Sequence, residues 1–455
     1  MIMCLPTEDT IAAIASAVSP GEGGIAVIRI SGKFSQKICK QIVYIPGNQV
    51  WSSHRVVYGH VIDQVTKKQI DEVLILIMES PRSFTREDVV EIHCHGGLIS
   101  VHRIMEQILS QPNVRRAFPG EFSQRAVLNG RLDLTQAEAI DDLISAKSQK
   151  AADLALAGLN GHLNKEINLY REKLLDQLSE IEARIDFEED LPPLNKEEVI
   201  ANIVQIKDAL QKLIRDARQG CYFRNGLKVT LIGLPNVGKS SILNLLSKQE
   251  KAIVTSIPGT TRDLLESEII LDGIPITLVD TAGIRNTNDE IEIVGIERSQ
   301  KALLTSDIVI LVFDLSVGWS KESEELSNQI PEHIPKLIVG NKADISVTSE
   351  IINPDIIFSA LTGKGKNDLI QSLLSLCGVN KTHDIEIALN ERQLDLVTST
   401  ANCLNKTLEV ANQDLPWDFW TIDLREAIQR LGELTGHELS EALLDKIFSR
   451  FCIGK

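Results

Sequence analysis

Residues 227–241 read LKVTLIGLPNVGKSS, and the apolar, helically spaced run ILNLLS follows them. The loop in this stretch fits the pattern Gly-x-x-x-x-Gly-Lys-Ser, whose glycines let backbone N–H groups wrap around phosphates. In that arrangement Lys239 reaches the β- and γ-phosphates, and the Ser240 hydroxyl ligates magnesium. A strand, a phosphate loop and a helix in this order predict an α/β domain built on a mostly parallel sheet.

Two further motifs belong around the same phosphates. DTAG follows the apolar run ITLV, so Asp280 can hold magnesium through a water and the Gly283 amide can meet the γ-phosphate. PGTTRD, at 258–263, supplies Thr261 as a second hydroxyl for magnesium. We therefore expect the magnesium ligands to be Ser240 and Thr261.

Two motifs that directly follow apolar runs indicate which nucleotide base is bound. NKAD follows KLIVG, and Asp344 can accept two hydrogen bonds from the edge of guanine, which adenine cannot donate there. SAL follows IIF and supplies a backbone contact to the base. Together the motifs predict a GTP site. Its expected residues are Asn236, Val237, Gly238, Lys239, Ser240, Ser241, Thr261, Asp280, Thr281, Ala282, Gly283, Asn341, Lys342, Asp344, Ser359, Ala360 and Leu361.

The water that attacks GTP needs an orienting group. Ile284 stands after DTAG, where GTPases of the Ras type carry a glutamine, and an aliphatic side chain cannot orient water. The acidic candidates downstream are Asp289, Glu290 and Glu292, each of which could equally begin a solvated helix. Asn236 could ligate a monovalent cation where an arginine finger would put its charge, or it could simply shape the loop.

The chain is too long for one core, and we expect about three domains. Short β-rich runs with Gly and Pro turns predict an α+β domain over residues 1–120. Apolar spacing by three and four predicts helices over 121–220, with one long helix or two in line between 136 and 187. Buried-type strands predict an α/β unit over 221–378, and residues 379–455 turn helical again. We interpret the α/β unit as an insertion between two halves of a helical domain.

Charge and cysteine usage restrict partners and compartment. The formal charge is −16 and the pI about 5.1, so a nucleic acid must be held at local basic patches. The seven cysteines are scattered without a Cys-x-x-Cys pair, which speaks against a disulfide framework or a structural zinc site. No apolar run reaches about 18 residues, the length that crosses a membrane. We expect a cytoplasmic protein with no membrane segment.

Two short motifs admit competing interpretations. In HCHGG, His93 and His95 share one face of a strand, but no third metal ligand stands at a supporting spacing. We prefer a turn that brings backbone close to a ligand. In the final FCIGK, Gly454 and Lys455 fit prenylation of Cys452 badly, which leaves a buried residue at a helix end or a reactive thiol.

Several stretches together resemble one family: GEGGIAVIRISG, SFTREDVVEIHCHGG, PGEFSQRAVLNGRLDLTQAEAI, PGTTRDLLE, DTAGIR and FCIGK. Over essentially its full length the chain resembles the MnmE (TrmE) family of tRNA-modifying GTPases. The resemblance implies an N-terminal folate-binding domain, similar to aminomethyltransferases, that forms the homodimer. It also implies a Ras-like GTPase domain inside a discontinuous helical domain.

The same resemblance implies a reaction. With the flavoprotein MnmG, in a heterotetramer-type complex, the family adds an aminomethyl or carboxymethylaminomethyl group to carbon 5 of the wobble uridine of certain tRNAs. The carbon donor implied is a tetrahydrofolate derivative, in the 5-formyl or methylene form. The alternative is a regulatory GTPase switch in ribosome or RNA assembly, against which the acidic balance and the lack of a basic Gly-x-x-Gly RNA module count.

By motif position, the resemblance implies folate contacts at Arg29, Glu91 and Arg131, with Lys455 close by. Arg131 departs from the lysine often found there, and it keeps the charge but not the geometry. From the residues alone, Arg29 and Glu91 could simply pair with each other. Cys452 is implied as a nucleophile toward carbon 6 of uridine or toward the folate-borne carbon.

The resemblance further implies a potassium ion that orders a loop and lets two GTPase domains meet across the dimer. Its expected ligands are Asn236, Thr255, Ile257 and Thr260, and the loop Thr255, Ser256, Ile257, Pro258, Gly259 and Thr260 joins the nucleotide site. The ion would offset transition-state charge as an arginine does. Glu292 then becomes the first choice for orienting the attacking water, through a bridging water. The expected catalytic residues are Glu292, Lys239 and Cys452.

Overall fold

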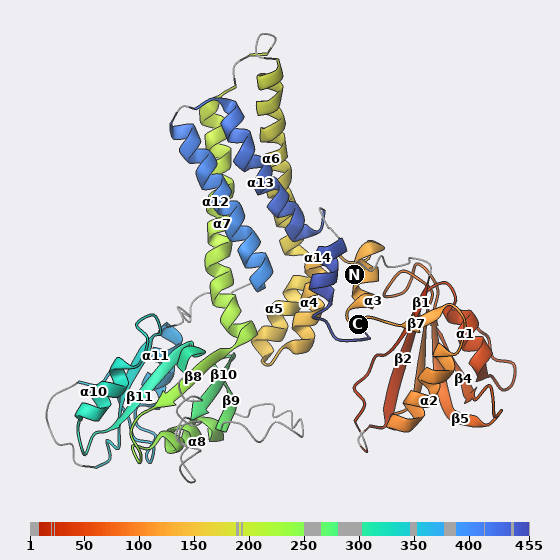
Figure 1. The fold of residues 1–455 in the computed structure, drawn as a ribbon, viewed down its shortest axis with the longest axis horizontal. Helices are drawn as coiled ribbons and strands as arrows, with labels where there is room; N and C mark the ends of the chain where they lie inside the picture. Colours follow the sequence, from red (N-terminus) through yellow and green to blue (C-terminus); the bar gives the residue numbers. More distant parts are fainter. Residues whose placement is uncertain are drawn as a thin grey trace. The chain divides into compact units, whose positions relative to one another are not determined.

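The computed structural model describes residues 9–19, 21, 23–187, 191–192, 194–249, 265–280, 303–345, 353–376, 388–413, 415–437 and 441–454. Contacts divide the chain into two compact units (Figure 1). Unit 1 comprises Met1–Asp141, Leu159–Leu194 and Leu415–Lys455, and unit 2 comprises Asp142–Gly158 and Asn195–Asp414. Among the described helices, none combines the length and the apolar character needed to cross a membrane.

Unit 1 is built on a seven-stranded sheet from the N-terminal part of the chain (Figure 1). Its strands are β1 (Thr10–Ile14), β2 (Ile25–Ser31), β3 (Val43–Tyr44), β4 (Arg55–Ile62), β5 (Gln69–Met78), β6 (Val89–His95) and β7 (Val114–Arg116). The order is β3-β4-β5-β6-β2-β1-β7, and all neighbours are antiparallel except the parallel pair β1 and β7. The β-rich runs predicted in this part of the chain are confirmed as strands: GGIAVIRI contains β2, RVVYGHVID contains β4, EVLILIM lies in β5 and DVVEIHC contains most of β6.

The two faces of this sheet differ. Helices α1 (Ser35–Ile42) and α2 (Leu98–Leu109) pack on one face, where alternate strand residues such as Ile28 and Ile75 are buried. Because successive side chains of a strand point to opposite faces, the residues between them lie on the other face. There α3 (Glu121–Leu128) covers β1, with Ile11 and Phe122 in one apolar cluster. The rest of that face carries the candidate site of unit 1.

Unit 1 also contains helices from the middle and the end of the chain. These are α4 (Leu134–Ser145), which ends past the boundary of the unit, α6 (His162–Asp186), α13 (Trp417–Thr435) and α14 (Glu441–Phe448). Helix α13 packs along α6, and α14 packs on α3. Leu134 of α4 shares an apolar cluster with Phe448 and Phe451, which anchors the end of the chain in unit 1.

The prediction of one long helix, or two in line, between 136 and 187 is wrong. Three helices, α4, α5 (Gln149–Leu159) and α6, share this stretch. The Ser148 hydroxyl accepts a hydrogen bond from Ala151 N at 3.2 Å, which caps the start of α5. Gly161, with a left-handed φ of 69°, separates α5 from α6. The apolar spacing continues through both breaks, so periodicity alone did not reveal them.

Unit 2 is built on a six-stranded sheet. Its strands are β8 (Leu227–Ile232), β9 (Leu265–Leu271), β10 (Ile274–Asp280), β11 (Ile308–Asp314), β12 (Lys336–Asn341) and β13 (Ile356–Ile357). The order is β13-β12-β11-β8-β10-β9, and only the hairpin of β9 and β10 is antiparallel. The helices around it include α8 (Lys239–Gln249), α10 (Lys321–Asn328) and α11 (Lys366–Leu376). The predicted mostly parallel sheet is confirmed, and the carboxyl ends of its parallel strands share one edge.

Long helices complete unit 2. They are α7 (Lys196–Asn225) and α12 (Glu391–Asn412), which pack along each other. Phe223 of α7 and Leu154 of α5 belong to the apolar core of the sheet. A Cβ atom at Gly226, where α7 meets β8, would lie 2.6 Å from the Pro275 carbonyl oxygen of β10, so glycine is required there. Helix α7 therefore contacts the β9–β10 hairpin, which lies in the sequence between the motifs PGTTRD and DTAG.

Candidate functional site

The phosphate loop joins β8 to α8 and is bent by residues with left-handed backbone angles. The φ angle is 62° at Asn236 and 99° at Gly238. Lys239 is buried, and its Nζ donates hydrogen bonds to the carbonyl oxygens of Gly233 (2.7 Å) and Leu234 (2.8 Å). Its ammonium group therefore lies within the loop, at the N-terminus of an eleven-residue helix, where phosphates bind.

Asn341 ties the phosphate loop to the segment predicted to contact the base. Its side-chain nitrogen donates to the Val237 carbonyl oxygen (2.8 Å), and its side-chain oxygen accepts from the Ala360 amide (3.0 Å). Only 2% of Asn341 is exposed, so losing either bond would leave a buried polar group unpaired. A Cβ atom at Gly238 would lie 2.2 Å from the Asn341 amide nitrogen, so glycine is needed for this approach.

Asp344 is oriented by the turn that follows β13. The Ser359 hydroxyl donates to the Asp344 carboxylate and accepts from the Thr362 amide at 3.2 Å. The Ser359 carbonyl accepts from the Gly363 amide at 2.8 Å, which closes the turn. Leu361 is 84% exposed, as suits a residue whose predicted contact is made by its backbone.

Two residues of this strand edge, Asp314 and Ser316, were not among the sequence predictions. Lys342 Nζ lies 2.6 Å from Asp314 Oδ2, while Asp314 Oδ1 accepts from the amide (2.9 Å) and the hydroxyl (2.7 Å) of Ser316. Burial acts to raise the pKa of Asp314, but the hydrogen bonds from Lys342 and Ser316 outweigh it and lower that pKa. The only sequence signal for this contact was an acidic residue, Asp314, directly after the apolar run IVILVF.

Several predicted residues lie outside the described part of the chain. They are Thr255, Ser256, Ile257, Pro258, Gly259, Thr260, Thr261, Thr281, Ala282, Gly283, Asp289, Glu290, Glu292 and Lys455. The backbone of Asp280 ends β10 opposite Leu231 of β8, which places it at the edge that holds the phosphate loop. Its side chain also lies outside the described set.

The predicted folate contacts meet on the sheet of unit 1. Arg29 of β2 and Glu91 of β6 are direct partners in the antiparallel register. Arg29 Nε and Nη2 each lie 2.8 Å from Glu91 Oε1. The pairing considered from the residues alone is therefore present. Both side chains lie on the face opposite α1 and α2 and remain partly exposed, so the pair is open to a ligand.

Two phenylalanines that the sequence analysis missed surround this pair. The guanidinium carbon of Arg29 lies 5.7 Å from the ring centroids of both Phe84 and Phe122. The guanidinium of Arg131 lies 5.4 Å from the Phe84 centroid. Cations over aromatic faces are attracted by the ring quadrupole. Phe84 thus connects Arg29 and Arg131, which are far apart in the sequence, in one cluster.

His93 and His95 contact different carboxylates. His93 Nε2 lies 3.4 Å from Glu91 Oε2 without hydrogen-bond alignment, and this buried nitrogen has no hydrogen-bond partner. His95 Nδ1 lies 2.6 Å from Asp71 Oδ1, and this hydrogen bond raises the pKa of His95. Within the described residues, the two histidines join no group of metal ligands. His93 belongs instead to the cluster around Arg29.

The C-terminal tail runs beside the same cluster. The Gly120 amide donates to the Cys452 carbonyl (3.3 Å), and Arg29 Nη1 donates to the Gly454 carbonyl (3.3 Å). Gly454 is left-handed at φ 97°, and a Cβ atom there would lie 2.6 Å from the Ile14 carbonyl oxygen. Cys452 is exposed, so the alternative of a buried helix-end residue is wrong. The tail is held by its backbone while the Cys452 side chain is left accessible.

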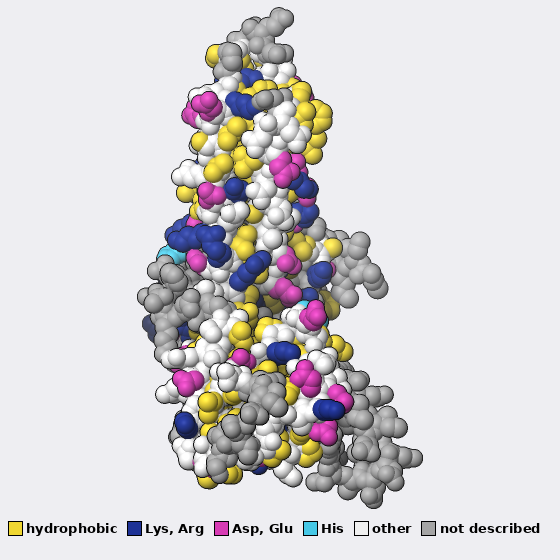
Figure 2. All heavy atoms as spheres, turned by 90° about the vertical axis from the view of Figure 1, so that its left-hand side faces the viewer, with side chains coloured by type: hydrophobic (Ala, Val, Ile, Leu, Met, Phe, Trp, Pro, Cys, Tyr) yellow, Lys and Arg dark blue, Asp and Glu magenta, His cyan; other side chains and the backbone are white. Residues whose placement is uncertain are grey.

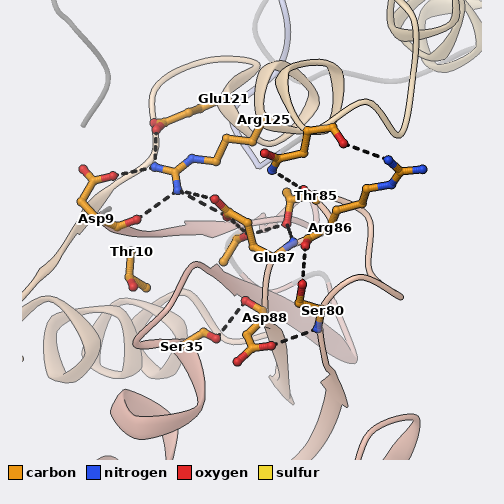
Figure 3. Close-up of polar contacts among 12 residues, drawn as sticks. Asp9, Thr10, Ser35, Ser80, Thr85, Arg86, Glu87, Asp88, Glu121 and Arg125 are labelled. Atoms are coloured by element: carbon orange, nitrogen blue, oxygen red, sulfur yellow. Dashed lines mark hydrogen bonds and ion pairs between the residues drawn. The ribbon is translucent and has the colours of Figure 1, made fainter. Parts of the chain in front are cut away.

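A charged network holds the loop between β5 and β6 against α3 (Figure 3). Arg125, which is 5% exposed, donates to Asp9 (2.7 Å) and to Glu121 (2.9 Å). It also donates to Glu87 of the loop at 3.1 Å. A buried charge is tolerated only when such partners surround it. The positions of the two phenylalanine rings, which come from this loop and from α3, therefore depend on the network.

Comparisons with known proteins agree over the whole chain. A family model described as MnmE helical domain matches residues 134–452, and one described as GTP-binding protein TrmE N-terminus matches residues 10–131. A curated tRNA modification GTPase MnmE from Prochlorococcus marinus is 64% identical over 455 residues, covering 100% of both chains. Its counterpart from a Synechococcus species is 58% identical over 451 residues, covering 99% of this chain and 100% of the relative.

Two solved structures are similar to part of the chain. Era from Aquifex aeolicus is 23% identical and covers 39% of this chain and 66% of its own, with a TM-score of 0.28. The G domain of the T. maritima FeoB iron transporter is 26% identical and covers 33% of this chain and 98% of its own, with a TM-score of 0.25. The two sheets and the two family models confirm the predicted α+β, helical and α/β multidomain class. The chain belongs to the MnmE family of tRNA modification GTPases.

Proposed function

We propose that this chain hydrolyses GTP at the strand edge of unit 2 and that potassium activates the reaction. With the flavoprotein MnmG, in the cytoplasm, the cycle serves the addition of an aminomethyl or carboxymethylaminomethyl group to carbon 5 of the wobble uridine of certain tRNAs. A tetrahydrofolate derivative, in the 5-formyl or methylene form, donates the carbon in unit 1. One observation carries the GTP part: Asn341 joins the Val237 carbonyl of the phosphate loop to the Ala360 amide of the base segment.

The phosphate half of the site is ready to receive a nucleotide. Lys239 Nζ donates to the backbone carbonyls of Gly233 and Leu234, and these two hydrogen bonds can be exchanged for bonds to phosphate oxygens. Ser240 is exposed at the start of α8, which fits a magnesium ligand together with Thr261. Magnesium there supplies charge neutralisation on the β- and γ-phosphates. Glu292 orients the attacking water, and the terminal phosphate leaves with GDP as the other product.

Of the four proposed potassium ligands, Asn236 belongs to the described part of the chain. It is exposed and left-handed at φ 62°, a conformation that costs backbone energy at a residue other than glycine. Thr255, Ile257 and Thr260 would complete the ion's shell. Potassium there supplies positive charge beside the phosphates.

The experiment that tests this function measures GTP turnover by the full chain in potassium chloride and in sodium chloride. We expect GTP turnover to be at least about tenfold faster in potassium chloride, because without potassium the transition state loses one stabilising positive charge. Asn236→Ala should remove the difference, while Asn328→Ala, at the end of α10, should keep it. If the wild-type chain hydrolyses GTP at equal rates in both salts, potassium does not activate the reaction and the proposed potassium site is wrong.

The unit 1 cluster fits a reduced folate. Arg29 and Arg131 offer cations, Glu91 offers a hydrogen-bond acceptor, and Phe84 offers a flat apolar face. The buried His93 Nε2 that lacks a hydrogen-bond partner is what a site for a polar ring system would contain. Lys455 would add a further cation. Cys452, exposed on the tail that Arg29 holds, is positioned for the nucleophilic role toward uridine or the folate-borne carbon.

A homodimer through the N-terminal domain is supported by the open sheet face. Two cross-strand rows lie on it, Val56–Leu76–Glu91–Arg29 and Tyr58–Leu74–His93–Val27. Val56 is 61% exposed and Leu74 is 49% exposed, although both belong to strands that pair with each other. Apolar side chains gathered on one open face mark an interaction surface. A second copy on this face would come close to the Arg29–Glu91 pair.

The surface charge bears on how tRNA is held. On the face drawn in Figure 2, Lys and Arg side chains are interspersed with Asp and Glu side chains. With a net charge of −16, the chain repels nucleic acid at long range. The tRNA is therefore held by local basic groups together with MnmG. The surface as a whole does not attract tRNA.

A further inference from the structure

Arg86 stands in the loop between β5 and β6, two residues after Phe84, in a backbone conformation that side chains rarely adopt. Its φ angle is 58°, in the left-handed region that favours glycine. The Arg86 amide donates to the Ser83 carbonyl at 3.4 Å, and the Ser80 hydroxyl donates to the Arg86 carbonyl at 2.8 Å (Figure 3). An arginine that keeps a strained backbone on an exposed loop indicates a use for its side chain.

The Arg86 side chain contacts the turn that follows α3. Its Nη1 atom donates to the Asn129 carbonyl at 3.0 Å, and a Cβ atom at Gly130 would lie 3.5 Å from the same nitrogen. The Asn129 side chain donates in return to the Thr85 carbonyl at 2.6 Å. Arg131 is the next residue of this turn. The loop and the turn are thus tied together, and each contributes one arginine.

Both arginines are exposed and carry charge that no described residue neutralises. The guanidinium of Arg131 lies 5.4 Å from the Phe84 centroid, as described above. Within the described part of the chain, no carboxylate pairs with Arg86 or Arg131, although the net charge is −16. The carboxylate of Glu87, the residue after Arg86, pairs with Arg125 instead (Figure 3). The two guanidinium groups are therefore available to an anionic ligand beside Phe84.

Exposure distinguishes the two ends of the proposed folate site. The Arg29 and Glu91 side chains are only 22% and 13% exposed. A pterin ring offers N–H donors that a carboxylate such as Glu91 can accept, and its flat face suits Phe84. The opposite end of a folate is a glutamate, whose carboxylates keep most of their hydration only where the site is exposed. The ring should therefore bind near Glu91 and the acidic end near Arg86 and Arg131.

We propose that Arg86 and Arg131 form a subsite for the glutamate chain of the folate, so that the site selects folates with several γ-linked glutamates over those with one. The inference rests on the proposed folate site of unit 1. Each added glutamate brings one further carboxylate, and the planar guanidinium group binds carboxylates through parallel N–H···O bonds. Arg131, which lies over Phe84, takes the first glutamate, and Arg86 takes those that follow. Arg86 uses one nitrogen for the Asn129 carbonyl and keeps further N–H donors for the chain.

The test measures dissociation constants of 5-formyltetrahydrofolate with one and with three glutamates, by isothermal titration of the full chain. The wild-type chain should bind the triglutamate form about fivefold more tightly, the upper range for exposed ion pairs. Arg86→Gly, which suits the left-handed backbone, should bind the two forms alike. Arg103→Met removes an exposed arginine of α2, on the other face of the sheet, and should keep the fivefold preference. Sodium chloride at about 0.5 M should reduce the preference of the wild-type chain through screening.

Two results would overturn the inference and leave the folate site in place. The first is equal affinity of the wild-type chain for the two folates. The second is a full preference for the triglutamate in Arg86→Gly, and if that variant also binds tRNA more weakly, the guanidinium holds RNA phosphates instead. Should Arg86→Gly fail to fold in circular dichroism, Arg86→Met takes its place with the same expectation. If the wild-type chain binds neither folate, the proposed folate site is wrong and the inference fails with it.

Discussion

Arg29 on β2 and Glu91 on β6 face each other across adjacent antiparallel strands, with two guanidinium nitrogens 2.8 Å from one carboxylate oxygen. The same guanidinium lies 5.7 Å from the centroid of Phe84 and 3.3 Å from the Gly454 carbonyl of the tail. Arg29 therefore connects the sheet, an aromatic ring and the end of the chain. If this cluster binds a reduced folate, replacing Arg29 should weaken folate binding more than replacing any other residue of the cluster.

Replacing Arg29 by methionine should weaken binding of 5-formyltetrahydrofolate at least about tenfold, because a charge-assisted hydrogen bond and a cation–π contact are both lost. Isothermal titration of the full chain measures this. The matched control is Arg103→Met on α2, which removes an exposed arginine that pairs with Asp63. Equal affinities of the two variants would show that the ligand does not contact Arg29.

Replacing Cys452 by serine should abolish modification of tRNA while GTP turnover stays at the wild-type rate. The thiol is exposed on a tail held by Arg29, whereas the nucleotide site belongs to unit 2. Reconstituted modification with MnmG, read by nucleoside mass spectrometry, is the measurement. Cys221→Ser, at a half-buried thiol of α7, is the control and should modify tRNA normally. Full modification by the Cys452 variant would refute the nucleophilic role.

Replacing Val56 by lysine should convert the proposed homodimer into monomers at micromolar concentration. Val56 stands on the open face of the sheet, where a buried ammonium would have no partner. Val65→Lys is the control, since Val65 is 89% exposed in the turn between β4 and β5. Sedimentation velocity separates the outcomes, and a Val56→Lys chain that sediments as a dimer would place the interface elsewhere.

Replacing Arg125 by methionine should destabilise the packing of α3 on the sheet by about 3 kcal/mol, because three carboxylates lose their shared cation. Hydrogen exchange of the α3 and β1 amides measures the change. Arg103→Met should alter that protection by less than about 0.5 kcal/mol, as usual for surface positions. Unaltered exchange in the Arg125 variant would mean that packing of α3 does not depend on the network.

Motifs and strand patterns predicted much of this architecture, because they depend on local spacing. Most strands of both sheets, and the place of the phosphate loop between β8 and α8, followed from apolar runs and glycines close in sequence. Contacts between distant segments did not follow. Phe84 and Phe122 had no motif of their own, and only the folded sheet brings them to Arg29.

Asp314 is another residue whose contact could not be predicted from local spacing. Asp314 ends β11, and its partner Lys342 directly follows the neighbouring parallel strand β12, so the register of the two strands brings them together. The breaks at Ser148 and Gly161 were local and visible, yet the apolar spacing that continues through them favoured a longer helix. Pairings across strands can therefore be found only from the structure, whereas helix ends can be predicted from the sequence through their capping residues.

We propose that GTP hydrolysis by this chain drives modification of wobble uridine. Nucleoside mass spectrometry tests this proposal on tRNA from cells that lack the gene, complemented with the wild-type chain or with Lys239→Ala. We expect the wild-type chain to restore the modified uridine and Lys239→Ala, which cannot hold the phosphates, to leave it unmodified. Modified wobble uridine at wild-type level in cells without the gene, or in those with Lys239→Ala, would contradict it.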